Sequence, residues 1–272
     1  MEAALPIQVF EQLIRAAFAS LPSLGLHAAR PLGIMLVLPV FTRMELGVLL
    51  RASVALGLAL PMLAPGWNGI DPGEGNTIPL VLLALKELFV GALIGFLLGI
   101  PFWSIQAVGE LIDTQRGITS EVAPLDQATR SPASAMGLFL GLAAIAVFVA
   151  SGGLGMMATT LYESYAIWPI RSGLPRIGPG SAPAVVKSLD HVLAFTLLVA
   201  GPVVILLLLV DLCVMLIGRF TPQLNAYDLA PLLKNIAFMV FVVLYLSYLA
   251  DYMGAELAKT RDIASQLELF LR

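Results

Sequence analysis

The sequence predicts an all-α, polytopic membrane protein made of packed helical hairpins. Of its 272 residues, 59% are hydrophobic and only 12% are charged, whereas soluble domains contain about 25% charged residues. The apolar residues form about six long segments separated by short stretches rich in Gly, Pro and charge, a pattern typical of membrane-associated helices. We therefore predict one domain over residues 1–272.

Composition also excludes several classes of function. The net charge of −3 is too small to indicate a nucleic-acid partner. The single cysteine cannot form an internal disulfide or a cysteine metal cluster, and no HExxH, P-loop or GxSxG motif is present. We expect neither enzymatic activity nor a metal or other cofactor.

The first segments predict an amphipathic helix followed by a hairpin. Residues 7–21 place apolar side chains on one helical face and are too short and polar to span a bilayer. Residues 24–41 and 46–63 are apolar and are joined by the charged turn 42–45. Residues 64–79 are rich in Gly and Pro and predict a loop.

Residues 78–108 predict one long helix with a surface for close packing. Gly91, Gly95 and Gly99 recur every four residues, so a neighbouring helix can approach one face closely. Near the start of this helix, Lys86 and Glu87 are interpreted as an ion pair at the membrane edge or between helices rather than a proton relay.

The polar stretch at residues 109–132 lies between two apolar segments and is the main candidate for function. It contains four acids, two arginines and several small hydroxylated residues. Such a stretch is either a solvated loop outside the membrane or irregular backbone at membrane depth. The second arrangement is tolerated only where the backbone is buried in protein or lines a water-filled cavity, so it would make the stretch part of a pore or gate.

The last part of the chain predicts two further apolar helices and an amphipathic tail. After the apolar run 133–151 and a mixed region, residues 191–218 are apolar, with Gly201-Pro202 expected to break the helix. Asp211 lies in this run, and an intramembrane carboxylate is a functional candidate by default; the alternative is a structural pair with a basic residue of another helix. Residues 235–252 form the last apolar segment.

Lys and Arg are distributed almost evenly over the loops on the two sides of the predicted spans. Membrane proteins threaded helix by helix usually show a bias in this distribution. The weak bias suggests helices packed in a larger assembly, with some of them at or above the membrane surface.

The polar segment RFTPQLNAYDLAPLLKN, at residues 219–235, resembles the PQ–N signature of the export-gate T/R family of type III secretion, the SctT/FliR/SpaR proteins. Tyr227 departs from the Phe that is common there. The segment is more similar to the injectisome T proteins than to the flagellar R proteins. Three earlier parts of the chain also resemble the family. The first is the amino-terminal hairpin, with Arg30, Pro39, Phe41, Arg51 and Pro61. The second is the start of the long helix, with Lys86, Glu87, Gly91 and Gly95, and the third is the polar stretch, with Gly109, Asp113, Gln115 and Gly117.

The resemblance implies a subunit of the bacterial inner-membrane export gate, through which unfolded proteins are secreted, in virulence-associated systems more than in flagella. It implies assembly with R-type and S-type subunits (flagellar P and Q equivalents), with the U-type switch protein and with the large export-gate subunit. It also implies a multi-pass protein partly raised to the periplasmic side.

The resemblance further implies that the loop after the third long helix, about residues 113–124, plugs the closed pore. The expected plug residues are Asp113, Thr114, Gln115, Arg116, Gly117, Ile118, Thr119, Ser120 and Glu121. Contacts between subunits are expected at Gly91, Gly95, Gly99, Arg219, Pro222, Gln223, Asn225 and Lys234, with Pro222, Gln223 and Asn225 in the turn of a helical hairpin.

Two other functions remain open at this point. A small-solute secondary transporter would use Asp211 and the broken helix at Gly201-Pro202 as its site. A purely structural assembly subunit would have no gating part.

Overall fold

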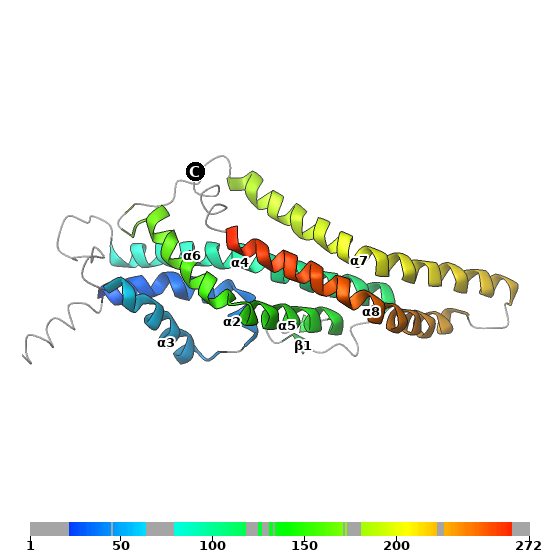
Figure 1. Ribbon diagram of the computed structural model, residues 1–272. Helices are drawn as coiled ribbons and strands as arrows, with labels where there is room; N and C mark the ends of the chain where they lie inside the picture. Colours follow the sequence, from blue (N-terminus) through cyan, green and yellow to red (C-terminus); the bar gives the residue numbers. More distant parts are fainter. Residues whose placement is uncertain are drawn as a thin grey trace, which may run out of the picture. The chain divides into compact units, whose positions relative to one another are not determined.

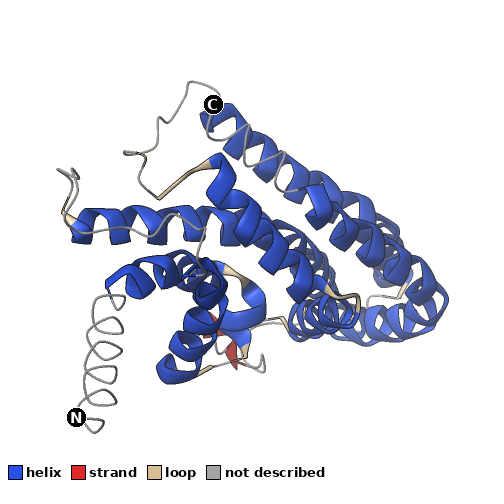
Figure 2. Cartoon of the chain, turned by 60° about the vertical axis from the view of Figure 1, so that its left-hand side comes forward, coloured by secondary structure: helices blue, strands red, loops and turns tan. Residues whose placement is uncertain are grey.

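The described part of the chain is helical apart from one pair of two-residue strands (Figures 1 and 2), which confirms the all-α prediction. The computed structural model describes residues 22–44, 46–63, 79–117, 125–126, 131–132, 134–170, 172, 181–221 and 226–262. Residues 22–37 are helical. The elements after them are α2 (Pro39–Arg43), α3 (Val48–Ala59), η1 (Leu60–Leu63), α4 (Leu80–Arg116), β1 (Leu125–Asp126), β2 (Ser131–Pro132), α5 (Ala135–Ala150), α6 (Gly153–Ile167), α7 (Ser181–Phe220), α8 (Ala226–Ala258) and η3 (Lys259–Asp262).

The chain divides into two compact units. The first unit comprises Met1–Leu97 and Met157–Arg176, and the second comprises Leu98–Met156 and Ile177–Arg272.

The first unit is built on a close crossing between helical residues 22–37 and α4. A Cβ atom added to Gly91 would overlap the carbonyl oxygen of Arg30, and one added to Gly95 would lie 2.8 Å from that of Ile34. The predicted glycine face is therefore used inside this chain, and contact of these two glycines with another subunit stays a prediction. A Cβ at Gly99 would instead meet the indole of Trp103 on the same helix, at 2.8 Å.

The second unit is organised by a hairpin of α7 and α8, which lie side by side (Figure 1). Three polar contacts join them, from Asp211 to Lys234, from Val199 to Tyr245 and from His191 to Glu256. Residue numbers fall on α7 as they rise on α8 in these contacts, so the two helices are antiparallel.

Helix α7 is continuous through Gly201-Pro202, so the predicted break is wrong. Proline removes one backbone hydrogen bond of the ladder, a loss that packing against a neighbouring helix can offset. Here the hydroxyl of Tyr245 on α8 donates at 2.8 Å to the carbonyl of Val199, the residue next to Leu198, whose carbonyl Pro202 leaves without its helical donor. The transporter alternative thereby loses the broken helix on which it depended.

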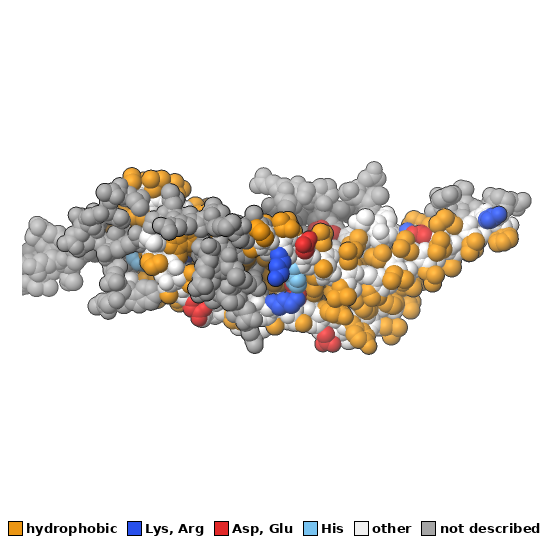
Figure 3. Space-filling model, turned by 90° about the horizontal axis from the view of Figure 1, so that it is seen from above, with side chains coloured by type: hydrophobic (Ala, Val, Ile, Leu, Met, Phe, Trp, Pro, Cys, Tyr) orange, Lys and Arg blue, Asp and Glu red, His pale blue; other side chains and the backbone are white. Residues whose placement is uncertain are grey.

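Three helical stretches are long and apolar enough to cross a membrane, at Leu80–Arg116, Pro183–Phe220 and Leu229–Ala258. The count over the described residues rises to four if α5 and α6 together form one bent span. The other expected segments, 24–41 and 46–63, are also helical but are broken into shorter pieces. On the face drawn in Figure 3, hydrophobic side chains cover much of the described surface, as expected for contact with lipid or other subunits.

Candidate functional site

The polar stretch predicted as a loop from Gly109 begins as helix. Helix α4 continues to Arg116, so Asp113, Thr114, Gln115 and Arg116 form its last turn, and the prediction that they are loop residues is wrong. Gly117 ends the helix with φ +75°, the left-handed conformation in which glycine commonly terminates helices. The chain therefore leaves helix α4 at Gly117.

Two glycines bring α4 and α5 together beside this point. A Cβ atom on Gly109 would lie 2.5 Å from the backbone nitrogen of Gly137, closer than real Cβ contacts allow. Because both residues are glycine, the end of α4 and the start of α5 approach at backbone distance. The two helices that flank segment 118–133 are thus held close to each other.

Asp113 fixes the start of α5. Its Oδ2 accepts a hydrogen bond from the hydroxyl of Ser134 at 2.7 Å and one from the backbone N–H of Met136 at 2.8 Å. Ser134 is the N-cap of α5, and its Oγ accepts from the N–H of Gly137 at 2.8 Å. The negative charge of the buried Asp113 carboxylate also stabilises the N-terminus of α5, where the helix dipole is positive. One carboxylate therefore closes the base of segment 118–133, and we call these anchoring contacts the loop base.

Arg116 continues the loop base toward α8. Its NH1 pairs with Asp113 Oδ1 at 2.9 Å, and its Nε donates to Asn235 Oδ1 at 3.0 Å. Its guanidinium also lies over the ring of Phe238, 4.2 Å from the ring centre, an arrangement that arginine favours. Arg116 therefore joins the last turn of α4 to the first half of α8.

Lys234 binds the same turn of α4. Its Nζ donates to the backbone carbonyl of Gln115 at 3.0 Å and pairs with Asp211 Oδ2 of α7 at 2.7 Å. Asp211 is thus held by a basic residue of another helix, the structural alternative considered for it from the sequence. Two acids and two bases, contributed by α4, α7 and α8, balance each other in this region.

Most of the other predicted plug and hairpin residues cannot be placed. Ile118, Thr119, Ser120 and Glu121 of the plug lie outside the described residues, as do Pro222, Gln223 and Asn225 of the hairpin turn. Arg219 is exposed in the last turn of α7. Ser134, Asn235 and Phe238 were not predicted as site residues. Of the three, only Ser134 has a local sequence signal, because a serine just before an apolar helix is a recognised N-cap.

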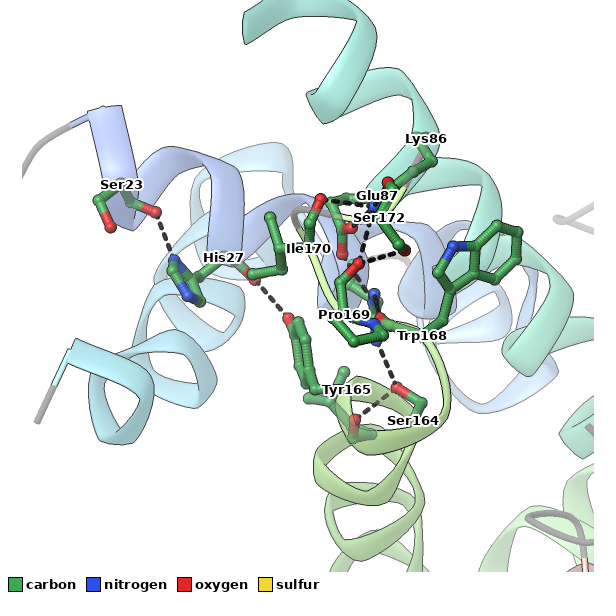
Figure 4. Close-up of polar contacts among 12 residues, drawn as sticks. Ser23, His27, Lys86, Glu87, Ser164, Tyr165, Trp168, Pro169, Ile170 and Ser172 are labelled. Atoms are coloured by element: carbon green, nitrogen blue, oxygen red, sulfur yellow. Dashed lines mark hydrogen bonds and ion pairs between the residues drawn. The ribbon is translucent and has the colours of Figure 1, made fainter. Parts of the chain in front are cut away.

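A second polar cluster lies in the core of the first unit (Figure 4) and involves Lys86 and Glu87. The Glu87 carboxylate is fully buried and pairs with Arg30 Nε at 2.7 Å and with Lys86 Nζ at 3.0 Å. Arg30 also donates to the Ser164 hydroxyl at 2.9 Å and to the Trp168 carbonyl at 2.8 Å. The guanidinium lies 3.8 Å from the ring centre of Tyr165.

Lys86 directs its three ammonium hydrogens to the turn after α6, so its contact with Glu87 is an ion pair rather than a further hydrogen bond. Its Nζ donates to the carbonyls of Pro169, Ile170 and Ser172 at 3.2, 2.7 and 3.1 Å (Figure 4). These carbonyls belong to the turn that follows α6, so the ammonium of Lys86 holds this turn against α4. Every charge in this cluster contacts a fixed partner, so the arrangement joins α4, α6 and helical residues 22–37 and offers no open site for a ligand.

Comparison with known proteins places this geometry in context. Residues 21–260 match the family model described as "Bacterial export proteins, family 1". The chain is 30% identical over 232 residues to "Yop proteins translocation protein T" of Yersinia pestis, covering 85% of this chain and 88% of that protein. It is 31% identical over 226 residues to "Surface presentation of antigens protein SpaR" of Salmonella typhimurium, covering 83% of each. "Flagellar biosynthetic protein FliR" of Bacillus subtilis is 27% identical over 165 residues, 60% of this chain and 63% of that protein.

Proposed function

The chain belongs to the bacterial export proteins, family 1, and we propose that its segment 118–133 closes the conduit of the export gate that the chain helps to form. It is a subunit of the inner-membrane export gate of a type III protein secretion system. The two translocation proteins of Yersinia pestis and Salmonella typhimurium have greater identity to the chain and greater coverage than flagellar FliR, which favours an injectisome over a flagellum. It is a multi-pass membrane protein that works with the other subunits of this apparatus.

The partners that we propose are the R-type and S-type subunits, with the U-type switch protein and the large export-gate subunit, and unfolded polypeptides in transit. The large hydrophobic side chains exposed along α7 and α8 support such assembly, because in the described chain nothing covers them. We also propose that part of the subunit lies above the bilayer on the periplasmic side. This placement is supported by the lengths of α3 and α5, which at 12 and 16 residues are shorter than a membrane span.

The observation that carries the sealing role is the anchored loop base. The residues on either side of segment 118–133 are tied together by Asp113, while Gly117 at its start has no neighbour within 4 Å of an added Cβ. A polar segment whose flanking residues are fixed can fill a conduit without being carried away by a passing chain. Exposed polar contacts contribute only about 0–1 kcal/mol each, so such a seal can be displaced and can re-form.

Replacing residues 118–124 by a Gly/Ser sequence of equal length tests the sealing role. The replacement leaves the loop base intact, so we expect the complex with its partner subunits to assemble. We expect it to leak small ions in the resting state, because a chain without bulky or charged side chains fills a conduit poorly. The measurement is ion conductance of the purified complex in planar lipid bilayers.

The matched control replaces residues 173–179, between α6 and α7, by a Gly/Ser sequence of the same length. We expect this complex to remain as tight as the native one. If the 118–124 replacement assembles and also stays tight, segment 118–133 is not the seal and the chain is a structural subunit.

A further inference from the structure

The hairpin of α7 and α8 contacts the loop base through a small set of side chains that the sealing role alone does not require. We propose that Lys234 and Asn235 on α8, set by Asp211 on α7, position the last turn of α4 and thereby hold segment 118–133 in its sealing arrangement. This proposal rests on the proposed function. It assigns Asp211 a positioning role rather than one in proton transfer.

The first support is that side chains of α8 converge on one turn of α4. Lys234 reaches the Gln115 carbonyl at 3.0 Å and Asn235 accepts from Arg116 at 3.0 Å. Phe238, one helical turn further on, lies under the Arg116 guanidinium. The last carbonyls of a helix have no partner within it, and a lysine ammonium is a favourable partner for them. The helix end from which the sealing segment leaves is therefore held from outside α4.

The second support is the geometry of Lys234. Lysine has a long flexible stem, and a single hydrogen bond to a carbonyl does not fix it. Asp211 accepts from the same Nζ at 2.7 Å, while the lysine side chain is 14% exposed and the aspartate side chain 26%. With one acceptor on α4 and a second on α7, the ammonium is held between the two helices. Among the described residues, the contact of Asp211 with α4 consequently runs through Lys234.

The third support is that these contacts form one continuous path. From Asp211 the path runs through Lys234 to the last turn of α4, and from Arg116 to Asp113 and then to Ser134 at the start of α5. Each step is an ion pair or a hydrogen bond of 3.0 Å or less. A shift of α7 and α8 against α4 must either break these contacts or move the last turn of α4 and the start of α5 with the hairpin. A displacement of the hairpin would therefore be transmitted to the residues on both sides of the sealing segment.

Two substitutions test the proposal in the assembled complex, Asp211→Asn and Lys234→Met. We expect both complexes to assemble and their resting ion conductance to rise by about three- to tenfold, the effect of losing one partly exposed charged contact. Asn235→Ala provides a second route to the same result if Lys234→Met fails to assemble. The matched control is His191→Ala, which removes another polar bridge between α7 and α8, the one to Glu256; we expect no change in conductance.

A charge exchange, Asp211→Lys with Lys234→Asp, separates positioning from simple bridging of α7 and α8. The exchanged pair restores an ion pair between the helices but places a carboxylate, which cannot donate, beside the Gln115 carbonyl. We expect assembly with the leak retained. Recovery of a tight complex by the exchange would overturn the proposal, as would native conductance in Asp211→Asn and Lys234→Met while the 118–124 replacement leaks. A tight 118–124 replacement would instead refute the sealing role on which the proposal rests.

Discussion

Replacing Glu87 with glutamine is expected to lower the free energy of unfolding of the chain by about 3–5 kcal/mol, the cost of breaking a buried ion pair. Glu87 is the carboxylate shared by Arg30 and Lys86, and its side chain is fully buried. Glutamine has nearly the same shape, so packing is preserved while two buried cations lose their common counter-charge. For a chain of this size we expect the thermal midpoint in mild detergent to fall by about 10 °C.

The effect should exceed that of Lys86→Met, which leaves Arg30 and Glu87 as a neutral pair and removes only the donor to three carbonyls. Such a loss costs roughly 1–3 kcal/mol for one buried group, and less for each of these carbonyls, because their bonds are only part-buried and water can replace the ammonium. Glu163→Gln is the matched control, because Glu163 is exposed on α6 of the same unit. Thermal unfolding followed by tryptophan fluorescence would rank the three variants. Equal midpoints for Glu87→Gln and Glu163→Gln would show that the buried cluster does not stabilise the fold.

Replacing Gly91 with valine is expected to separate α4 from helical residues 22–37. The new Cβ would overlap the carbonyl oxygen of Arg30 and lie 3.0 Å from the Cα of Gly33. Both are backbone atoms, which cannot move aside as a flexible side chain can. We expect a loss of about 3 kcal/mol or more, at the upper end of overpacking costs, and little assembled complex.

Gly25→Ala is the control for this substitution. Gly25 is also helical, but a Cβ there meets nothing within 4 Å. Alanine should therefore stabilise the helix slightly, by about 0.5–1 kcal/mol. The yield of monodisperse protein and its thermal midpoint report both effects. A Gly91→Val chain as stable as the Gly25→Ala chain would contradict the close crossing.

The sequence predicted the fold wherever local pattern decides the outcome. Apolar runs gave the long helices, and the spacing of Gly91 and Gly95 indicated a close helix contact. The same pattern could not say that the contacting helix belongs to this chain. It also could not show that α7 passes through Gly201-Pro202, because neighbouring packing makes the continuous helix possible.

At the candidate site, the local sequence pattern correctly located the polar stretch but predicted that the loop begins before Asp113, whereas helix α4 continues to Arg116. The charges of Asp113 and Arg116 indicate a loop when only neighbouring residues are considered. Their partners, Ser134 and Asn235, lie 21 and 119 residues away, and these tertiary contacts allow helix α4 to include them. The partner of Asp211, Lys234, could likewise not be predicted from the sequence, because an ion pair between two helices depends on how the helices pack and not on local spacing.

The most direct test of the sealing role is a density map of the assembled export gate in its resting state. The account predicts that residues 118–133 cross the central axis and fill the conduit, with Asp113 and Ser134 in contact beside it. A map that shows the same segment on the outer rim, with the conduit closed by other subunits, would contradict it.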